Sequence, residues 1–279
     1  MLARTSILAI MAVVLVPAGA VSQDLPDHGR FTDLLEKVVE TPLVDYQEVL
    51  ELRHALDAYV EELGRTEPAS LEGASQNEQL AFWLNAYNAC MLRLVADNYP
   101  IEPGGVGFRQ GARNVAAGRP DNSPWQIRDV FSGDHCMVAG EERSQDEIEH
   151  DFIRPIFQDP RIHFAVNCAA WDCPELRPEA YVGARLDEQL DDQVRIFMDQ
   201  SRHFRIEEGS PTVLHVNQVL DWFSEDFGGE DGIPDFFLPY LSDEEPELLR
   251  GEVQVEFIHY DWTLNDVHTE PEDGGEPVR

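Results

Sequence analysis

The chain has 279 residues, and its 54 acidic against 20 basic side chains give a formal net charge of −34. Nucleic acid is excluded as a partner because phosphate binding requires a basic surface, and anionic membranes are disfavoured for the same reason. Such a charge serves solubility, as in a salty habitat, or attracts a cationic partner. Hydrophobic residues make up 43%, enough for a core that folds without disulfides.

Residues 1–20, MLARTSILAIMAVVLVPAGA, have the pattern of a secretory signal peptide. Arg4 precedes an apolar run at 7–16, and Ala18-Gly19-Ala20 has the form of a cleavage site. The run is too short to anchor the protein in a bilayer. The first cysteine is Cys90, so no cysteine follows the cleavage site to carry a lipid. We therefore expect a periplasmic or secreted protein with no membrane anchor after signal cleavage.

An N-terminal extension at 21–43 precedes the first predicted helix. Apolar residues recur at helical spacing in four segments, at 44–63, 77–96, 186–197 and 217–227. Ser144 and Glu147 form a capping-box pattern that begins a further short helix, and Pro155 is expected to end it. Residues 101–124 have no periodicity and predict a long loop.

The predicted strands lie mostly in the second half of the chain. Residues 161–167 and 253–260 are expected to be single strands, and two hairpins are predicted, one around Val130 with 136–138 and one from 203–207 with 212–216. The last residues, 269–279, predict a disordered acidic tail.

The segment 77–96, NEQLAFWLNAYNACMLRLVA, is apolar nearly all round, which predicts a central buried helix. Helices come first in the chain, strands and helices alternate afterwards, and no repeat or linker divides them. The sequence therefore predicts one α+β domain over 44–268. In this domain the central helix would pack against a mostly antiparallel sheet, with several helices around them.

Asparagines of the central helix are the first candidate site residues. Asn85 and Asn88 lie on one helix face with Asn77. A buried amide is costly unless its hydrogen bonds are satisfied. The two side chains either bind neighbouring backbone and fix the packing, or line the floor of a pocket.

The segment RIHFAVNCAAWDCPELRPEAY, at 161–181, holds the second group of candidates. In an extended strand His163 and Asn167 share a face, and His163 would lie roughly 16 Å from Cys168. His163 would then line a pocket or the core rather than act as the base for the thiol. His150, next to Glu149 in the capped helix, is the better candidate base, because a neighbouring imidazole lowers a thiol's pKa.

The cysteines leave three alternatives open. Cys168 and Cys173 flank a short loop that could close into a disulfide in an oxidising compartment. Cys168 could instead be a reactive thiol, or an inert reduced one. No zinc, calcium, phosphate-loop or dinucleotide motif occurs, so the sequence predicts no metal and no cofactor.

Four ordered motifs resemble one known family. They are NEQLAFWLNAYNA, SQDEIEHDFIRP, DPRIHFAVNCAAWDCPELRPEAY and HYDWTLN. Together they resemble the DUF-547 family of unknown function, in an exported bacterial member, over roughly 45–265. The resemblance implies that Asn85, Asn88, Glu149, His150, His163, Asn167, Cys168, Cys173 and Pro174 belong to family motifs, without assigning roles to them. The link Ala-Ala-Trp-Asp between the cysteines departs from the smaller, Ser-containing link expected there.

Two hypotheses of function follow. In the first, the protein is a thiol hydrolase or acyltransferase acting on peptide or cell-wall amide bonds. Cys168 is the nucleophile, His150 the base and Asn85 the orienting residue, while Asn88, Glu149, His163 and Asn167 form the binding site. In the second, the protein is a non-catalytic binding or scaffold domain with a structural Cys168–Cys173 disulfide. Its partner is a peptide, a small molecule or another protein.

Overall fold

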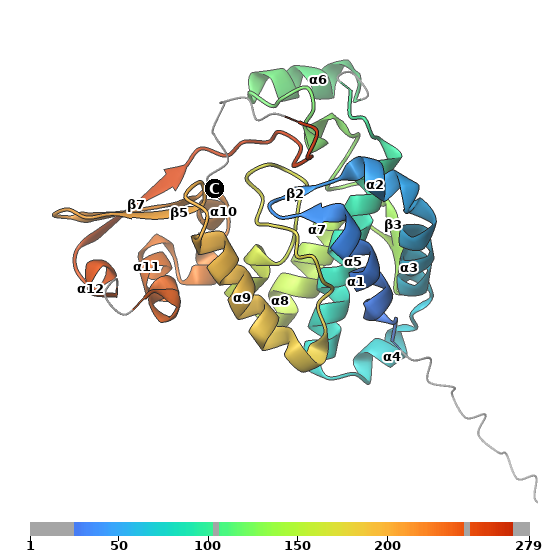
Figure 1. Ribbon diagram of the computed structural model, residues 1–279, viewed down its shortest axis with the longest axis horizontal. Helices are drawn as coiled ribbons and strands as arrows, with labels where there is room; N and C mark the ends of the chain where they lie inside the picture. The colour runs from blue at the N-terminus through green and yellow to red at the C-terminus, as the bar shows by residue number, and fades with distance from the viewer. Residues whose placement is uncertain (1–24, 103–105, 243–245, 270–279) are drawn as a thin grey trace, which may run out of the picture.

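The computed structural model describes residues 25–102, 106–242 and 246–269. The predicted signal peptide and nearly all of the predicted acidic tail lie outside the described residues. Helices make up most of the fold (Figure 1). The α-helices are α1 (His28–Val38), α2 (Tyr46–Glu51), α3 (Arg53–Arg65), α4 (Pro68–Glu72), α5 (Gln76–Asp97), α6 (Gly107–Ala116), α7 (Gln145–Glu147), α8 (Arg154–Phe157), α9 (Leu186–Met198), α10 (Val219–Trp222), α11 (Ile233–Phe237) and α12 (Pro246–Leu249).

Short strands of the described segments form three small sheets. They are β1 (Val39–Glu40), β2 (Leu43–Val44), β3 (Cys136–Val138), β4 (Glu141–Arg143), β5 (Phe204–Glu207), β6 (Thr212–Asn217) and β7 (Val253–Ile258). The pairs β1–β2, β3–β4 and β5–β6 are antiparallel, and β7 joins β6 in parallel. The predicted α+β fold in a single domain is confirmed, as is the hairpin that β5 and β6 form. The predicted N-terminal extension at 21–43 contains α1, which packs into the core.

The predicted central helix is confirmed as α5. Ser75 begins it with a capping box, in which the Ser75 hydroxyl accepts from the Glu78 N–H at 3.3 Å and the Glu78 carboxylate accepts from the Ser75 N–H at 2.9 Å. From Leu80 to Ala96 every residue except Arg93 is buried. Its main packing partners are other helices, foremost α3, the 3₁₀ helix Gly183–Arg185 and the helical segment 148–153. Helices therefore enclose α5, and the three-stranded sheet lies to one side of them (Figure 1).

Two hydrophobic cores meet near the middle of the chain. The larger contains α1, α3 and α5, and the smaller lies between α9, α11 and the sheet formed by β5, β6 and β7. The 3₁₀ helix Pro160–Phe164 contributes Ile162 to the first core and Phe164 to the second. His163 is thereby fixed at the junction of the two cores.

Several predicted elements differ from the structure. The strand predicted at 161–167 is wrong, because Asp159 caps the 3₁₀ helix Pro160–Phe164 and the chain then bends. The loop predicted at 101–124 contains α6. The hairpin predicted around Val130 is also wrong, since β3 pairs with β4, which follows it. The Ser144 cap is confirmed by a 3.0 Å bond from the Glu147 N–H, but the helical turns continue past Pro155 to Phe157.

Candidate functional site

A cavity of about 460 Å³ opens beside the cysteine segment. This volume is in the range of small-molecule sites. One end of the cavity carries ionisable side chains from 146–163, and the other end is aromatic. Cys168 lies in the same lining.

Cys168 is a free, partly exposed thiol in an activating environment. Its Sγ lies 3.1 Å from the Tyr260 hydroxyl. Burial raises the pKa of Cys168, but hydrogen bonds from Cys173, Tyr260 and the Ala170 backbone outweigh burial and lower it below its usual value. The next residue, Ala169, has a φ of 64°, in the left-handed region that non-glycine residues rarely adopt. Such conformations cluster at active sites.

The C-terminal segment holds this cysteine segment in place. The Trp171 N–H donates to the Thr263 carbonyl at 2.6 Å, and the Asn265 N–H donates to the Ala169 carbonyl at 3.1 Å. These bonds place Tyr260 against the thiol, although it lies 92 residues further along the chain.

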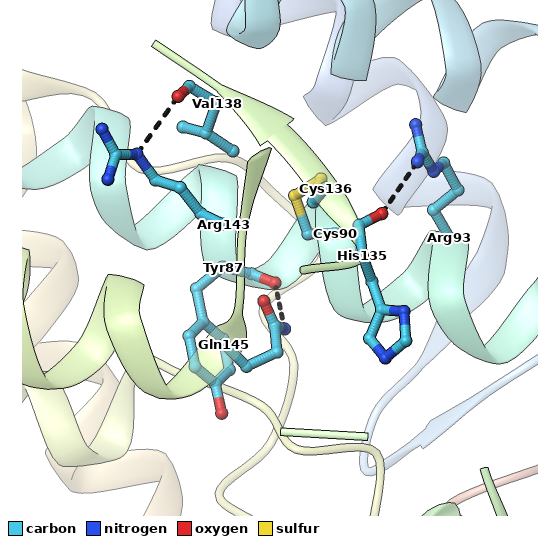
Figure 2. The surroundings of a disulfide bond; sticks show 8 residues. All are labelled: Tyr87, Cys90, Arg93, His135, Cys136, Val138, Arg143 and Gln145. Carbon is cyan, nitrogen blue, oxygen red and sulfur yellow. Dashed lines mark hydrogen bonds between the residues drawn. A yellow bond between two sulfur atoms is a disulfide. The ribbon is translucent and has the colours of Figure 1, made fainter. Parts of the chain in front are cut away.

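The cysteine pairing differs from the disulfide hypothesis. The disulfide joins Cys90 of α5 to Cys136 of β3, as Figure 2 shows, and Cys168 and Cys173 are both free. Cys173 is buried and its Sγ accepts from the Cys168 N–H at 2.7 Å. Burial raises the pKa of Cys173 well above its usual value. The two neighbouring thiols are therefore unequal, and Cys168 is the one that ionises more readily.

His163 is buried in the cavity wall and oriented by a carboxylate. Its Nε2 lies 2.7 Å from Asp226 Oδ2, and its ring stacks on Phe223 with centroids 4.2 Å apart. Burial lowers the pKa of His163, whereas the hydrogen bond from His163 holds the pKa of Asp226 far below its usual range. Because an ionised Asp226 can only accept, we assign the ring proton to Nε2. Nδ1 is then the unprotonated nitrogen.

Glu149 faces this free nitrogen. Its Oε1 lies 4.0 Å from His163 Nδ1, and neither atom has a hydrogen-bond partner among the described residues. Burial, more than any neighbouring charge, raises the pKa of Glu149 to about 7. The π-helix Ile148–Ile153 turns Glu149 inward, and wider turns of this kind are frequent at functional sites. At neutral pH this carboxyl exchanges a proton readily.

His150, the predicted base, is placed differently from His163. Its side chain is exposed at the edge of the cavity, and Arg154 Nη1 lies 3.1 Å from its Nδ1. Burial and then the Arg154 charge lower the pKa of His150. An arginine can only donate, so the Nδ1 lone pair of His150 is occupied by this bond.

The predicted asparagines hold the backbone and lie outside the cavity lining. The Asn85 amide donates to the Tyr181 carbonyl and accepts from its N–H, both at 2.8 Å. Asn88 likewise donates to the Ala165 carbonyl and accepts from the Asn167 N–H, both at 2.9 Å. With these bonds made, Asn85 is not free to orient an imidazole.

Asn167 also binds backbone. It donates to the Pro174 carbonyl at 2.8 Å and accepts from the Ala169 N–H at 3.0 Å. Asn88 and Asn167 together fix the turn that presents Cys168. The structure therefore brings Cys168, His163, Glu149 and His150 to one cavity and places the asparagines behind it.

Three groups of the site escaped the sequence analysis. No sequence pattern indicated Asp226 as a site residue, because its partner His163 is 63 residues away in the chain. Tyr260 and Trp262 lie in the motif HYDWTLN, which singled them out without suggesting a role. Trp125 and Trp222 complete the aromatic end of the cavity and belong to no recognised motif.

The described segments show neither a metal-binding cluster nor a membrane-spanning helix. They contain no group of three or more His, Cys, Asp or Glu side chains arranged to hold a metal ion. No helix in the same segments has the length and apolar character needed to cross a bilayer.

Comparison with known proteins agrees with the motif resemblance. A family model described as "Protein of unknown function, DUF547" matches residues 71–198, so this segment of the chain is similar to that family. The match contains every site residue predicted from the sequence, whereas Asp226, Tyr260 and Trp262 lie beyond it. No curated protein and no solved structure matches the chain.

Proposed function

We propose that the protein is a thiol-dependent hydrolase or acyltransferase of peptide or cell-wall amide bonds, with Cys168 as the nucleophile. One observation carries the proposal. A free cysteine with a lowered pKa shares a cavity with a buried, carboxylate-oriented imidazole whose Nδ1 is unpaired among the described residues. Nucleophile, base and orienting group are the three parts that thiol catalysis requires.

The base in this proposal is His163, with Asp226 as its orienting residue. The sequence predicted His150 as the base. However, the Nδ1 lone pair of His150, which would have to take the thiol proton, already accepts a hydrogen bond from Arg154. The objection to His163 was its separation from Cys168 in an extended strand. The 3₁₀ helix is shorter than a strand of the same residues, and both side chains line one cavity. Nδ1 of His163 is free to take the thiol proton, while Asp226 stabilises the imidazolium that results.

The reaction proceeds in two halves. Cys168 transfers its proton to His163, and the thiolate attacks the amide carbon to form a C–S bond. The Tyr260 hydroxyl, whose pKa burial raises well above its usual value, stays protonated and donates to the oxyanion. The C–N bond then breaks, and the amine leaves with the proton from His163.

The thioester is resolved in the second half. Water, or a second amine in a transferase, gives its proton to His163 and attacks the thioester carbon. The C–S bond breaks, and the proton returns to Cys168. Glu149, with its pKa of about 7, lies beside Nδ1 and can relay a proton to or from the leaving and entering groups.

Alkylation followed by mass spectrometry tests the nucleophile. The native protein is treated with iodoacetamide from pH 5 to 10, and labelling of each free cysteine is mapped. We expect Cys168 to label at a lower pH than Cys173, and Cys173→Ala to move labelling of Cys168 to higher pH, because it removes a hydrogen bond that lowers the pKa of Cys168. A panel of peptides and cell-wall fragments is then screened for release of free amine, with Cys168→Ala as the control.

The alternative, a non-catalytic binding domain, predicts other results. Cys168 would label only at the pH of an ordinary thiol, and no amide would be turned over. The version of this alternative that relied on a Cys168–Cys173 disulfide is overturned, because both residues are free thiols. The aromatic end of the cavity is the feature that would favour a binding domain.

We also propose that the protein works outside the cytoplasm. The signal-like pattern at 1–20 supports export, and so does the Cys90–Cys136 disulfide, since such bonds persist in oxidising compartments. Fractionation of the native host, with a fragment map of the purified protein, tests both points. Recovery of the uncleaved chain from the cytoplasm with Cys90 reduced would contradict the proposal.

A further inference from the structure

Arg119 is an unusual cation at the aromatic end of the cavity. Its guanidinium stacks over the Trp125 ring at 3.3 Å from the centroid, and Nη1 donates to Asn114 Oδ1 at 3.0 Å. The chain has 54 acidic residues, yet none in the described segments forms an ion pair with Arg119. A partly buried charge without a counterion is costly unless something else compensates it.

The position of Arg119 is built by the protein. Asn114 is buried, and its amide donates to the Trp125 carbonyl at 2.8 Å and to Gln126 Oε1 at 3.3 Å. Asn114 therefore fixes both the stacking ring and the guanidinium that lies over it. Burial lowers the pKa of Arg119, in agreement with a cation that lacks a neighbouring carboxylate.

A continuous row of rings connects this cation to the nucleophile. Cys168 Sγ contacts the Tyr260 hydroxyl at 3.1 Å, Tyr260 packs on Trp262 with centroids 4.5 Å apart, and Trp262 packs on Trp125 at 5.4 Å. Arg119 ends the row. A ligand lying along these rings has one part at the thiol and another at the guanidinium.

The carboxyl beside His163 favours one direction of binding. Glu149 lines the cavity there, with its Oε1 4.0 Å from His163 Nδ1. An anionic group is repelled there and attracted at Arg119, whereas a leaving amine is favoured next to the carboxyl. The charge distribution thus orients an acyl donor with its anionic part away from the proton-transfer groups.

We propose that Arg119 is the residue that recognises a carboxylate on the substrate, so that Cys168 acts on amides whose acyl part carries a carboxylate. This inference rests on the proposed thiol function for the reaction, but the carboxylate site itself does not depend on catalysis. The carboxylate is either the side-chain carboxylate of an acidic residue that is cut at its α-carbonyl, or the α-carboxylate of one that is cut at its side-chain carbonyl. Arg119 binds it with its remaining N–H groups, and the aromatic rings bind the apolar part of the acyl group.

Two alkylating reagents that differ in charge test the site. 4-(Iodoacetamido)benzoate and 4-(iodoacetamido)benzamide form the same C–S bond with release of iodide, but only the benzoate carries a carboxylate, across a ring from the reacting group. The ratio of their rates at Cys168 is measured in the wild type, in Arg119→Gln and in Arg119→Lys. Arg113→Gln, an exposed arginine of α6, provides the same change of net charge outside the cavity.

We expect Arg119→Gln to lower the benzoate-to-benzamide ratio by roughly tenfold, the value of one charge-assisted hydrogen bond. Arg119→Lys should restore part of it, and Arg113→Gln should leave it unchanged. An unchanged ratio in Arg119→Gln, or an equal fall in Arg113→Gln, overturns the inference.

A binding measurement separates this inference from the proposed function. Calorimetry compares N-acetylphenylalanine, which has a terminal carboxylate, with its uncharged amide, and with N-acetylglutamic acid α-amide, whose carboxylate is on the side chain. At least one carboxylate should bind the wild type and lose roughly tenfold in affinity in Arg119→Gln. If Cys168 is inert but this dependence holds, the thiol function fails and the carboxylate site stands. If the affinity for neither carboxylate depends on Arg119, the inference fails whether or not Cys168 is reactive.

Discussion

Replacing Glu149 with glutamine should change how the stability of the protein depends on pH. Burial raises the pKa of this carboxyl from 4.5 to about 7 in the folded chain. Between these values the folded protein keeps a proton that the unfolded chain has already released. Stability from this group is therefore fully present below pH 4.5 and is lost as the pH rises through 7.

The size of the effect follows from the two pKa values. The gap between 4.5 and about 7 corresponds to about 3 kcal/mol of unfolding free energy, at about 1.4 kcal/mol per pH unit. Glutamine has no proton to lose in this range. Relative to the wild type, Glu149→Gln should therefore gain up to about 3 kcal/mol on going from pH 5 to pH 8.

Urea unfolding at pH 5 and pH 8 measures this difference. Comparing each protein with itself at the two pH values cancels any fixed cost of burying the amide. Glu142→Gln, an exposed acid on β4, controls for the loss of one negative charge. If Glu149→Gln and Glu142→Gln show the same pH dependence as the wild type, Glu149 titrates like a solvated carboxyl and the proposed proton relay has no basis.

Three further predictions concern the framework of the site. Removing the disulfide by Cys90→Ala with Cys136→Ala should cost about 4 kcal/mol in urea unfolding, because the bond closes a loop with a sequence separation of 46. Asn88→Ala should cost roughly 2–4 kcal/mol in the same assay, since it leaves a buried carbonyl and a buried N–H unpaired. Asp226→Asn should lower the pKa of His163 further in an NMR titration, because it removes the carboxylate that raises it.

Each of these three predictions has a contradicting result. An unchanged urea midpoint in the double cysteine variant would mean that Cys90 and Cys136 are not bonded in solution. If Asn88→Ala lowers the free energy of unfolding by less than about 0.5 kcal/mol, the Asn88 amide is solvated, as at an ordinary surface site. A raised pKa for His163 in Asp226→Asn would show that Asp226 does not pair with the imidazole.

The sequence predicted the elements whose pattern is local. The central helix could be predicted because 77–96 is apolar on all faces, and the β5–β6 hairpin because two alternating runs flank a turn. The strand predicted at 161–167 failed although a local signal was present. Asp159 and Pro160 are residues typical of a helix N-terminus, but the prediction gave more weight to the apolar residues that follow them.

The site depended more on contacts that sequence alone cannot reveal. Cysteine residues and the segment around His163 were visible as candidates, but the pairing of Cys90 with Cys136 is one of several connectivities that four cysteines allow. The bond between His163 and Asp226 joins segments 63 residues apart. Asn85 was found as a candidate, but its role could not be predicted. A polar residue on a buried helix face can line a pocket or hydrogen-bond to neighbouring backbone, and only its partners in the structure show which.

The aromatic end of the cavity has a practical consequence for experiments on this protein. Three of the chain's five tryptophans, Trp125, Trp222 and Trp262, line the cavity. Trp222 is 46% exposed and stacks on Trp262 with centroids 5.6 Å apart. Any molecule that reaches Cys168 along these rings changes the solvent around the indoles, and with it their fluorescence emission and the near-UV circular dichroism of the stacked pair. The unlabelled protein can therefore report which compounds enter its site before any reaction is known.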